Sequence, residues 1–551
     1  MTNQPAASLG KFPFCFSRRQ LAILLLAWIS LFAGINTKPI EDHESLVLQT
    51  TREMSARGDW VLPYFNQKPR LNKPPLNYWF TKAISVADPF SDDIEPWHGR
   101  ACSLLGGLML LLTTAYACGK LYGAPTGFLA TILLLGIKGF VEFSHQARPD
   151  FLYSALCVVQ LFAWIGAWRA SDGSSSQRLY SSLGWGLAGL ATLSKGPQVS
   201  ALFLLGFLLL LLCGSERRRT LKVLRPVSGA MIFLAISLPW WLLLQNRLQS
   251  TGINIANTQL SGALLATHSV WEEILSFYYI FTLLEDLLPL SVLLPFLIFW
   301  NRRKLGKPDD VSRLLLYVSS TTLLVFTVAG HYRPHYMLPL LPLFTTLLAI
   351  WIRKMNHPAI PKFFWRVFFS LGVVALLVCA GLLFRQHQYQ ILILLSVTSV
   401  ALVLLLKKEA CEKVWGEKPL LLPLIATSLL ATLLFTGFNA LPSRKASREQ
   451  NRDLGFSIQQ VVKPGDQVAT WKQTLDVMPY YTRHQVLRVD ESEELKIRIE
   501  RLEMGNAFYL LIPQNDIPDL ESEFEISMLE TTDKPSKSNK ELVCVKILKP
   551  R

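Results

Sequence analysis

Residues 35–80 read INTKPIEDHESLVLQTTREMSARGDWVLPYFNQKPRLNKPPLNYWF and separate the first long apolar stretch of the chain from the second. This segment begins with an acidic cluster around His43 and ends with two prolines followed by aromatic residues. It is rich in ionisable residues, and apolar stretches flank it on both sides. A polar segment tethered in this way predicts a loop at a membrane surface that carries the chemistry of the protein.

The composition of the chain indicates a membrane protein. Hydrophobic residues make up 51% of the 551 residues and charged residues 17%, whereas about 25% of a typical soluble domain is charged. Thirteen apolar stretches are long enough, or nearly so, to cross a hydrocarbon core of ~30 Å as helices. They centre on 20–36, 99–118, 125–141, 150–168, 180–194, 199–213, 226–245, 281–300, 313–329, 335–353, 365–384, 388–406 and 419–440. The sequence therefore predicts a mainly α-helical, polytopic protein with about thirteen transmembrane helices.

The formal net charge of +15 is explained by membrane topology and gives no reason to expect a nucleic-acid partner. With an inner N-terminus and thirteen spans, most Lys/Arg clusters fall in cytoplasmic connections, as the positive-inside rule requires. They include Arg217-Arg218-Arg219, Arg302-Arg303-Lys304 and Lys407-Lys408. The same topology makes residues 37–98 the first outer loop.

Two helices are expected in this first outer loop. Residues 44–57 carry apolar side chains at helical spacing and predict an amphipathic helix on the membrane, ended by Gly58. The prolines that follow keep the chain extended as far as Pro75, after which a second helix is expected.

The composition changes at about Leu441 to that of a soluble domain. Strands are predicted at 465–471, 484–490, 506–514, 523–530 and 541–548, and helices at Ser447–Val462 and Glu491–Met504. We therefore expect a transmembrane domain over residues 1–440 and a small α/β soluble domain over residues 441–551, on the outer face.

Ionisable and aromatic residues recur at three later outer turns. The first turn contains Arg148-Pro149-Asp150, the second Ser194-Lys195-Gly196-Pro197 and the third Arg333-Pro334-His335-Tyr336. Because the predicted topology places these turns on the same side as the first loop, we expect one outward-facing site.

The motifs in these segments, taken in order, resemble those of the protein O-mannosyltransferase-like membrane glycosyltransferases. The resemblance is closest to the bacterial aminoarabinose transferase (ArnT) group, and it covers roughly residues 20–345 by motif. The matching strings are REM at 52–54, GDW at 58–60, KPPL at 73–76, RPD at 148–150, GLA-x-LSKGP at 189–197 and RPHYMLPLLP at 333–342. Each string alone is weak, but their shared order is specific. The resemblance implies the C-type glycosyltransferase fold.

The resemblance also implies an activity. Such enzymes are inverting glycosyltransferases that move a sugar from a polyprenyl (undecaprenyl) phosphate carrier to an envelope acceptor on the far side of the membrane. The expected sugar is 4-amino-4-deoxy-L-arabinose or a related sugar, and the expected acceptor is lipid A or another envelope glycan. The expected location is the bacterial inner membrane, with the active site and the C-terminal domain on the periplasmic side.

Two other functions stay open at this point. One is a protein O-mannosyltransferase that uses polyprenyl-phosphate mannose, and the other is a lipid flippase or transporter. Against transport, the ionisable residues lie at loop edges, whereas a translocation path would place them at mid-span.

The expected chemistry assigns roles to particular residues. An anionic polyprenyl-phosphate leaving group needs a fixed cation or a metal where charge develops. In similar enzymes the KPP lysine contacts this phosphate, so the resemblance assigns that role to Lys73. Further substrate-binding candidates are Arg148, Lys195, Arg333, His335 and Tyr336. The catalytic candidates, as base or orienting carboxylate for the acceptor, are Asp42, His43, Glu44 and Asp150.

The sequence departs from the family pattern at two positions. The first-loop aspartate of the family falls on His43, so that either Asp42 or Glu44 takes its role, or His43 itself acts as a base or metal ligand. Asn72 replaces the acid that precedes the KPP lysine in similar aminoarabinose transferases, which would weaken a metal site there. Whether the protein uses a divalent metal stays open, and no residue is assigned to hold one.

Structural explanations compete with each functional one. Asp42 and Glu44 could complement the dipole of the helix that begins there, and Arg148 with Asp150 could form a loop salt bridge. Lys195 could cap helix carbonyls. His335 and Tyr336 could belong to an interfacial belt.

Overall fold

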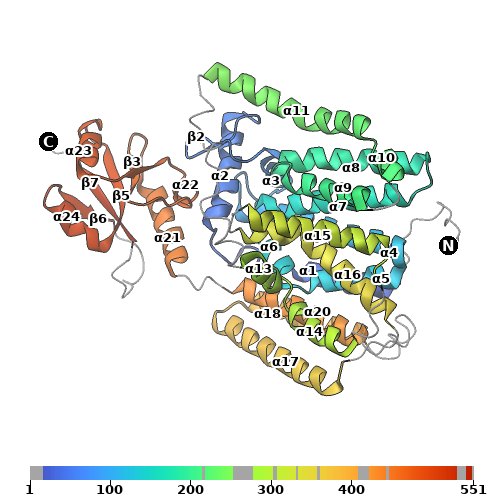
Figure 1. Cartoon of the computed structure of the whole chain (residues 1–551). Coiled ribbons are helices and arrows are strands. Elements are labelled where there is room, and N and C mark those ends of the chain that lie inside the picture. Colours follow the sequence, from blue (N-terminus) through green and yellow to red (C-terminus); the bar gives the residue numbers. More distant parts are fainter. Residues whose placement is uncertain are drawn as a thin grey trace.

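The computed structural model is mainly helical and carries one small sheet near its C-terminus (Figure 1). It describes residues 16–213, 217–251, 277–301, 307–329, 333–355, 360–406, 421–441, 446–529 and 542–548. The helices up to residue 440 are α1 (Arg18–Ser30), α2 (Asp42–Arg57), α3 (Leu76–Val86), α4 (Pro96–Tyr122), α5 (Ala124–Leu135), α6 (Lys138–Ser144), α7 (Pro149–Arg169), α8 (Ser175–Ser194), α9 (Gln198–Cys213), α10 (Arg217–Leu224), α11 (Pro226–Thr251), α13 (Tyr278–Asp286), α14 (Leu290–Asn301), α15 (Asp310–Val328), the 3-10 helix η3 (Pro334–Leu340), α16 (Leu341–Lys354), α17 (Lys362–Arg385), α18 (Tyr389–Leu405) and α20 (Leu421–Ala440).

The chain is a multi-pass membrane protein, but the predicted number of thirteen spans is not confirmed. Within the described residues, seven helices are long and apolar enough to cross a membrane, or up to nine if each of two bent pairs is one span. The pair α5 and α6 bends by 64°, and the pair α13 and α14 bends by 94°. Other predicted stretches form shorter helices, such as α1 and α18. Hydropathy found these apolar stretches but could not show where they bend or end.

The spans differ in how far protein covers them. Nearly all of α7 is buried, whereas α17 exposes large apolar side chains such as Leu371 and Leu377. The outer helices α11 and α17 lie on opposite sides of the bundle (Figure 1). Helix α8 packs closely on α7 at Gly184, where a Cβ atom would lie 2.3 Å from the Trp164 ring. Apolar exposure on α17 is expected where lipid replaces protein as the neighbour.

The first outer loop folds as predicted along the chain. Helix α2 ends at Gly58, which has a φ of 63°, and α3 begins after Pro75. Between them, β1 (Tyr64–Phe65) and β2 (Lys68–Pro69) form a short antiparallel hairpin. Its two-residue turn, Asn66-Gln67, has positive φ at both positions, as a type I′ turn requires.

The apolar side of α2 contacts protein. Val47 and Met54 are buried against Tyr78 of α3, and Leu48 is buried beside Tyr481 in the C-terminal part of the chain. The prediction that the apolar side of this helix lies on the membrane is therefore wrong, because that side packs on protein. The amphipathic pattern reflects packing between α3, α4 and the C-terminal region.

The five predicted C-terminal strands are confirmed. They are β3 (Gln467–Trp471), β4 (Val486–Val489), β5 (Ala507–Pro513), β6 (Ile526–Met528) and β7 (Leu542–Leu548). The sheet order is β4-β3-β5-β7-β6, in which β4, β3 and β5 are parallel, and β7 is antiparallel to β5 and to β6. The accompanying helices are α21 (Ala446–Val461), α22 (Met478–Thr482), α23 (Ser492–Glu500), η4 (Gln514–Asp516) and α24 (Ile517–Glu521). Strand β4 is thus one edge of the sheet.

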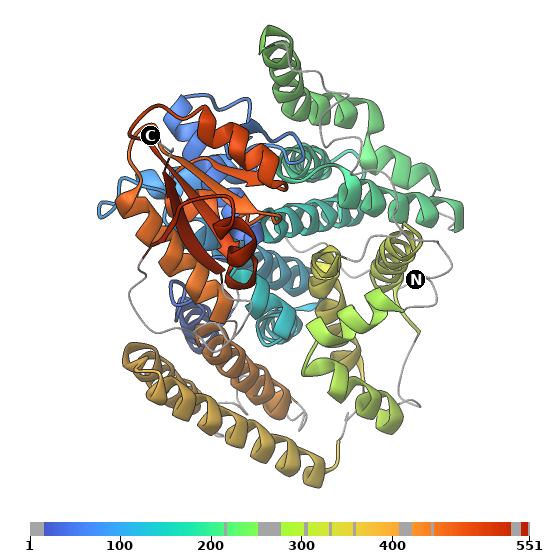
Figure 2. The same ribbon diagram turned by 90° about the vertical axis from the view of Figure 1, so that its left-hand side faces the viewer.

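The C-terminal part lies beside the first outer loop. Figure 1 shows the sheet at one end of the molecule with α22 turned toward α2, and Figure 2 views the molecule from that end. The backbone N–H of Ile40 donates to the Tyr481 hydroxyl at 2.9 Å, and Arg448 pairs with Glu41. The two regions are therefore joined by direct polar contacts.

Candidate active site

The Arg148-Pro149-Asp150 turn begins α7. Arg148 is the N-cap with an extended backbone, and Pro149 occupies the first helical position, where a missing N–H and a fixed φ are favourable. Asp150 then lies in the first turn, where the helix dipole favours a carboxylate. Its side chain is only 5% exposed. Local sequence rules thus place an acid at this helix end, and the tertiary structure buries it.

Three cationic or basic side chains from three segments surround the Asp150 carboxylate. Lys195 Nζ lies 2.5 Å from Oδ1, and Arg148 Nε lies 2.9 Å from Oδ2. His335 Nε2 lies 3.6 Å from Oδ1, and its Nδ1 lies 2.9 Å from a guanidinium nitrogen of Arg148. Lys195 is the C-cap of α8, and His335 lies in the first turn of η3. The three later outer turns predicted to share a site therefore do meet.

Two aromatic rings lie close to the Lys195 ammonium. Its Nζ lies 4.5 Å from the centre of the Tyr336 ring and 5.6 Å from the centre of the Tyr153 ring. The Tyr153 hydroxyl is itself held, because it accepts a hydrogen bond from the Val199 N–H at 2.9 Å. Cation–π contacts of this kind stabilise a desolvated ammonium. Lys195 is thus a fixed positive charge.

Lys73 lies next to this cluster. Its charge interacts with those of Lys195, Asp150 and Arg148. Burial, reinforced by the neighbouring cations, lowers the pKa of Lys73 to about 8. Within the part of the chain that the structure describes, no hydrogen bond or salt bridge engages its ammonium. Lys73 is therefore a half-buried cation that is available to a ligand.

The site carries a surplus of positive charge. Arg148 and Lys195 contact the buried Asp150 carboxylate directly, and the Lys73 charge also interacts with it. Arg333 is solvent-exposed, and its charge reaches His43. Such an arrangement at the ends of membrane helices can bind an anionic group strongly, because the surrounding protein screens the charges less than water does.

Glu44 is committed to a structural role. Its Oε1 accepts from Arg100 Nε at 2.8 Å and from the Ala147 N–H at 2.9 Å. Its Oε2 accepts from the second Arg100 nitrogen at 2.9 Å and from the Glu41 N–H at 3.0 Å. Burial favours a higher pKa for Glu44, but Arg100 and the backbone N–H groups of Ala147 and Glu41 together outweigh it, so the pKa is lowered. Both oxygens of this candidate base are thus occupied.

Asp42 and His43 are solvent-exposed, unlike Glu44. Partial burial lowers the pKa of His43, and the charges of Arg148 and Arg333 lower it further. His43 is therefore close enough to the cluster around Asp150 for the charges of that cluster to act on its imidazole. A neutral imidazole at pH 7 can accept a proton, so His43 and Asp42 are the two accessible candidates of the first loop.

Several residues of the site were missed from the sequence. Arg100, which holds Glu44, lies in the apolar helix α4, and an arginine within a membrane helix is itself a signal of an important site. Tyr153, which faces Lys195, gave no signal because an aromatic residue in an apolar helix is ordinary core. Arg70 interacts electrostatically with Lys73 but followed no motif.

No group of three or more His, Cys, Asp or Glu side chains in the described ranges is placed to hold a metal ion. Asn72 precedes Lys73 where the family pattern has an acid. Its Oδ1 is buried without a hydrogen-bond partner. A divalent metal stays unassigned to any residue.

Comparisons with known proteins agree with the motifs. A family described as dolichyl-phosphate-mannose-protein mannosyltransferase matches residues 72–243. Undecaprenyl phosphate-α-4-amino-4-deoxy-L-arabinose arabinosyl transferases of Yersinia pestis and Yersinia pseudotuberculosis are 24% identical over 343 residues, which is 60% of this chain and 58% of theirs. The matched region therefore spans less than two thirds of these curated relatives.

Solved structures extend the likeness to the whole chain. The crystal structure of ArnT from Cupriavidus metallidurans bound to undecaprenyl phosphate superimposes with a TM-score of 0.70 at 17% identity, and covers 96% of this chain and 97% of ArnT. The apo structure of the same protein gives a TM-score of 0.69 at 18% identity. The predicted resemblance to ArnT and the predicted fold are thereby confirmed.

Proposed function

We propose that this protein is an inverting glycosyltransferase that uses a sugar carried on undecaprenyl phosphate. The observation that carries the proposal is the surplus of positive charge formed by Lys73, Arg148 and Lys195 around Asp150. A phosphate that becomes a leaving group gains negative charge, and fixed cations in a poorly hydrated site stabilise that charge. The similarity to ArnT, whose structure holds undecaprenyl phosphate, supports this donor.

The proposed reaction assigns roles to the candidate residues. An acceptor oxygen attacks the anomeric carbon of the sugar, and the bond from that carbon to the phosphate oxygen breaks with its electron pair. Lys73 binds the departing phosphate, and Arg148, Lys195, Arg333, His335 and Tyr336 complete the donor site. Asp150, which the sequence offered as a catalytic carboxylate, orients the cations in this proposal, because Lys195 binds its Oδ1 and Arg148 its Oδ2.

The acceptor proton passes to a base in the first loop. Asp42 and His43 are the candidates for this role, because both are accessible and the His43 imidazole is in its neutral, proton-accepting form at neutral pH. The occupied carboxylate of Glu44 fits a supporting role better. Direct displacement at one carbon inverts its configuration and needs a single base.

We propose 4-amino-4-deoxy-L-arabinose as the sugar and lipid A as the acceptor. The names of the curated relatives support this sugar. We also propose that the protein lies in the bacterial inner membrane with its site on the periplasmic side. The proposed division is a transmembrane domain over residues 1–440 and a periplasmic α/β domain over residues 441–551.

A second candidate is protein O-mannosylation from polyprenyl-phosphate mannose. The description of the family that matches residues 72–243 favours it, but the curated transferases and the solved ArnT structures favour the aminoarabinose reaction. A flippase or transporter is less well supported, because Asp150, Lys195 and His335 gather at helix ends.

Mass spectrometry of lipid A from cells with and without the gene tests the acceptor and the sugar. The expected result is an added mass of one aminoarabinose that disappears with Lys73→Ala. Lys496→Ala, on an exposed face of α23, is the control and keeps the modification. Unmodified lipid A with mannosylated protein would favour the second candidate, and full transfer by Lys73→Ala would refute the role of the cationic site.

A further inference from the structure

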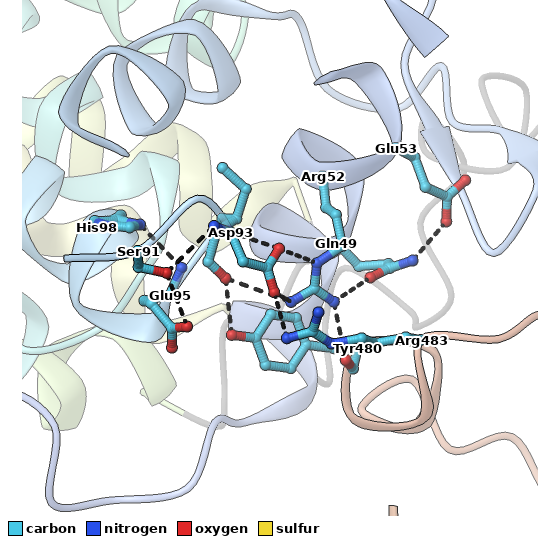
Figure 3. Close-up of polar contacts among 10 residues, drawn as sticks. Gln49, Arg52, Glu53, Ser91, Asp93, Glu95, His98, Tyr480 and Arg483 are labelled. Atoms are coloured by element: carbon cyan, nitrogen blue, oxygen red, sulfur yellow. Dashed lines mark hydrogen bonds and ion pairs between the residues drawn. The ribbon is translucent and has the colours of Figure 1, made fainter. Parts of the chain in front are cut away.

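The C-terminal region and the first outer loop meet in a polar network that the proposed reaction does not use. Figure 3 shows Arg52 of α2 at its centre, between Asp93 of the loop before α4 and Tyr480 of α22. The Arg52 side chain is 16% exposed and that of Asp93 is 21% exposed. This network is therefore largely shielded from water.

The Arg52 guanidinium joins three segments of the chain. It forms a bidentate pair with Asp93, at 2.8 and 2.9 Å. One terminal nitrogen donates to the Tyr480 carbonyl at 2.9 Å and to Gln49 at 3.0 Å. The guanidinium also lies 4.2 Å from the centre of the Tyr480 ring. A planar bidentate donor with a stacked face is a contact that lysine cannot reproduce.

Two further contacts strengthen this junction. Arg483, which follows α22, lies 2.7 Å from the second oxygen of Asp93, and the Tyr480 hydroxyl donates to the Ile94 carbonyl at 2.9 Å. Arg483 is half-exposed, so its ion pair contributes less than the shielded Arg52 pair. Asp93 is thus held between Arg52 of α2 and Arg483 of the C-terminal region.

Asn66 forms a second connection, at the turn of the β1–β2 hairpin. Its side-chain amide donates to the Val486 carbonyl at 2.7 Å and accepts from the Val486 N–H at 2.8 Å. Val486 begins β4, the edge strand of the C-terminal sheet. The Asn66 amide therefore pairs with this edge as a neighbouring strand would.

Glu53, which is 5% exposed, links the Arg52 junction with the Asn66 connection. Its Oε1 accepts from the Asn66 N–H at 2.7 Å and from Gln49 at 3.0 Å, and its Oε2 accepts from the Gln67 N–H at 3.0 Å. Gln49 in turn accepts from Arg52. A continuous network thus runs from the hairpin turn through α2 to α22.

The hairpin leads directly to Lys73. The Arg70 N–H donates to the Pro63 carbonyl at 2.8 Å, which closes the hairpin just before the Lys73 segment. Because the Lys73 ammonium has no protein partner in the described ranges, its position depends on the backbone that carries it. The opposite end of α2 carries Asp42 and His43. The same network therefore supports both sides of the proposed site.

The C-terminal region also reaches the site electrostatically. Burial raises the pKa of Asp476, which precedes α22, and the charge of Asp42 raises it further, whereas that of Arg70 lowers it. Asp476 is consequently close enough to sense residues on both sides of the proposed site.

We propose that the C-terminal region acts as a positioning element for the donor-phosphate site, and that Asn66 and Arg52 are the positioning residues through which it acts. This inference rests on the proposed role of Lys73 as the phosphate-binding cation. The C-terminal region holds the hairpin and α2 in place, and thereby sets where Lys73 stands relative to Lys195 and Asp150. Donor affinity then depends on a part of the chain that contributes no group to the reaction.

The test compares Asn66→Gly with the wild type in full-length protein reconstituted with undecaprenyl-phosphate aminoarabinose. Glycine keeps the positive φ of the turn and removes only the amide. The expected result is a KM for the donor about tenfold higher, with a smaller change in kcat. Arg488→Ala is the matched control and keeps wild-type kinetics, because Arg488 lies on β4 and, among the residues that the structure describes, its side chain bonds to Asp490 and Thr474 of the C-terminal region.

A pH profile separates positioning from a merely structural effect. Lys73 is faced by Lys195, Asp150, Arg70, Arg148 and His335. If Asn66→Gly releases Lys73 from these neighbours toward water, the pKa of Lys73 rises. The alkaline limb of the kcat/KM profile then moves to a higher pH than in the wild type. An unchanged donor KM would overturn the proposal, and so would a raised donor KM with an unchanged alkaline limb, because a merely structural effect gives the second pattern.

Further variants keep the two hypotheses apart. Asn66→Asp retains an acceptor for the Val486 N–H and is expected to give an intermediate KM. If Asn66→Gly yields too little inserted protein, the donor KM of Asn66→Asp is compared with that of the wild type instead. A raised donor KM supports the positioning role, and an unchanged donor KM overturns it. Full activity of Lys73→Ala would refute the proposed function itself, whereas wild-type kinetics of Asn66→Gly with inactive Lys73→Ala refutes only the positioning role.

Discussion

The Nζ atom of Lys195 lies 2.5 Å from Oδ1 of Asp150, and the two residues belong to different helix ends. Asp150 is in the first turn of α7, and Lys195 caps the end of α8. These helices pack side by side, so the start of one and the end of the other meet. The pair is buried, with side chains 5% and 8% exposed. Its energetics therefore differ from those of a surface salt bridge.

We expect Asp150→Asn to destabilise the protein and abolish transfer, because it leaves Lys195 and Arg148 buried without their counter-charge. Removing one partner of a buried ion pair costs about 3–5 kcal/mol. Asp150→Asn/Lys195→Met should recover part of this stability without recovering activity. Thermal unfolding in detergent and transfer assays measure the two effects. Equal melting temperatures for wild type and Asp150→Asn would contradict the burial argument.

The pH dependence of donor use should report Lys73. The pKa of Lys73 is lowered to about 8, so its positive charge is present below that pH and is lost as the pH rises through it. We expect kcat/KM for the donor to fall above about pH 8, since this parameter reports the free enzyme. Lys73→Arg, which stays charged, should remove this alkaline limb while lowering activity. A wild-type profile that is flat to pH 10 would exclude Lys73 as the titrating group.

The acids of the first loop should separate into structural and catalytic groups. Glu44→Gln should lower the free energy of unfolding by roughly 3–5 kcal/mol, because it leaves the Arg100 charge buried. Substitution of the true base, through Asp42→Asn or His43→Ala, should reduce kcat by about 10²–10⁴-fold with little change in stability. Parallel kinetics and unfolding measurements distinguish the two patterns. A wild-type kcat in both Asp42→Asn and His43→Ala would show that the base does not lie in this loop.

Asp476→Asn should stabilise the protein at neutral pH. The pKa of Asp476 is raised in the folded state, so keeping it ionised costs stability once the pH exceeds that value. The stability of the wild type should fall relative to the variant as the pH rises from about 4. Below that pH the carboxyl is neutral in both folded and unfolded states, and the difference should vanish. Asp490→Asn, at an exposed position, is the control. A stability advantage of Asp476→Asn over the wild type that grows as the pH is lowered would contradict the prediction.

Local rules were sufficient for much of the fold. Gly58 ended α2 and Pro75 preceded α3 as predicted, because turn and helix-boundary signals depend on neighbouring residues. The five C-terminal strands followed from alternating and apolar runs. The Arg148, Lys195 and His335 turns were predicted to meet, since charge placement put them on one side of the membrane.

Long-range partners decided the rest. Glu44 looked equivalent to Asp42 in the sequence, but Arg100 lies far along the chain and only the folded structure shows that it occupies both Glu44 oxygens. The bends between α5 and α6 and between α13 and α14 likewise lie inside apolar stretches that read as continuous spans.

The sequence by itself determined the class of the protein, because hydrophobicity, charge and motif order depend on the order of residues and not on contacts between distant segments. Tertiary structure decided which ionisable groups are left free. Burial and neighbours from distant segments decide whether a carboxylate or ammonium is available to a ligand or bound in an internal ion pair. Lys73 is an example of the first case and Glu44 of the second. Tertiary structure likewise brings Asn66 of the first loop against Val486 of the C-terminal sheet, where the two residues form two hydrogen bonds.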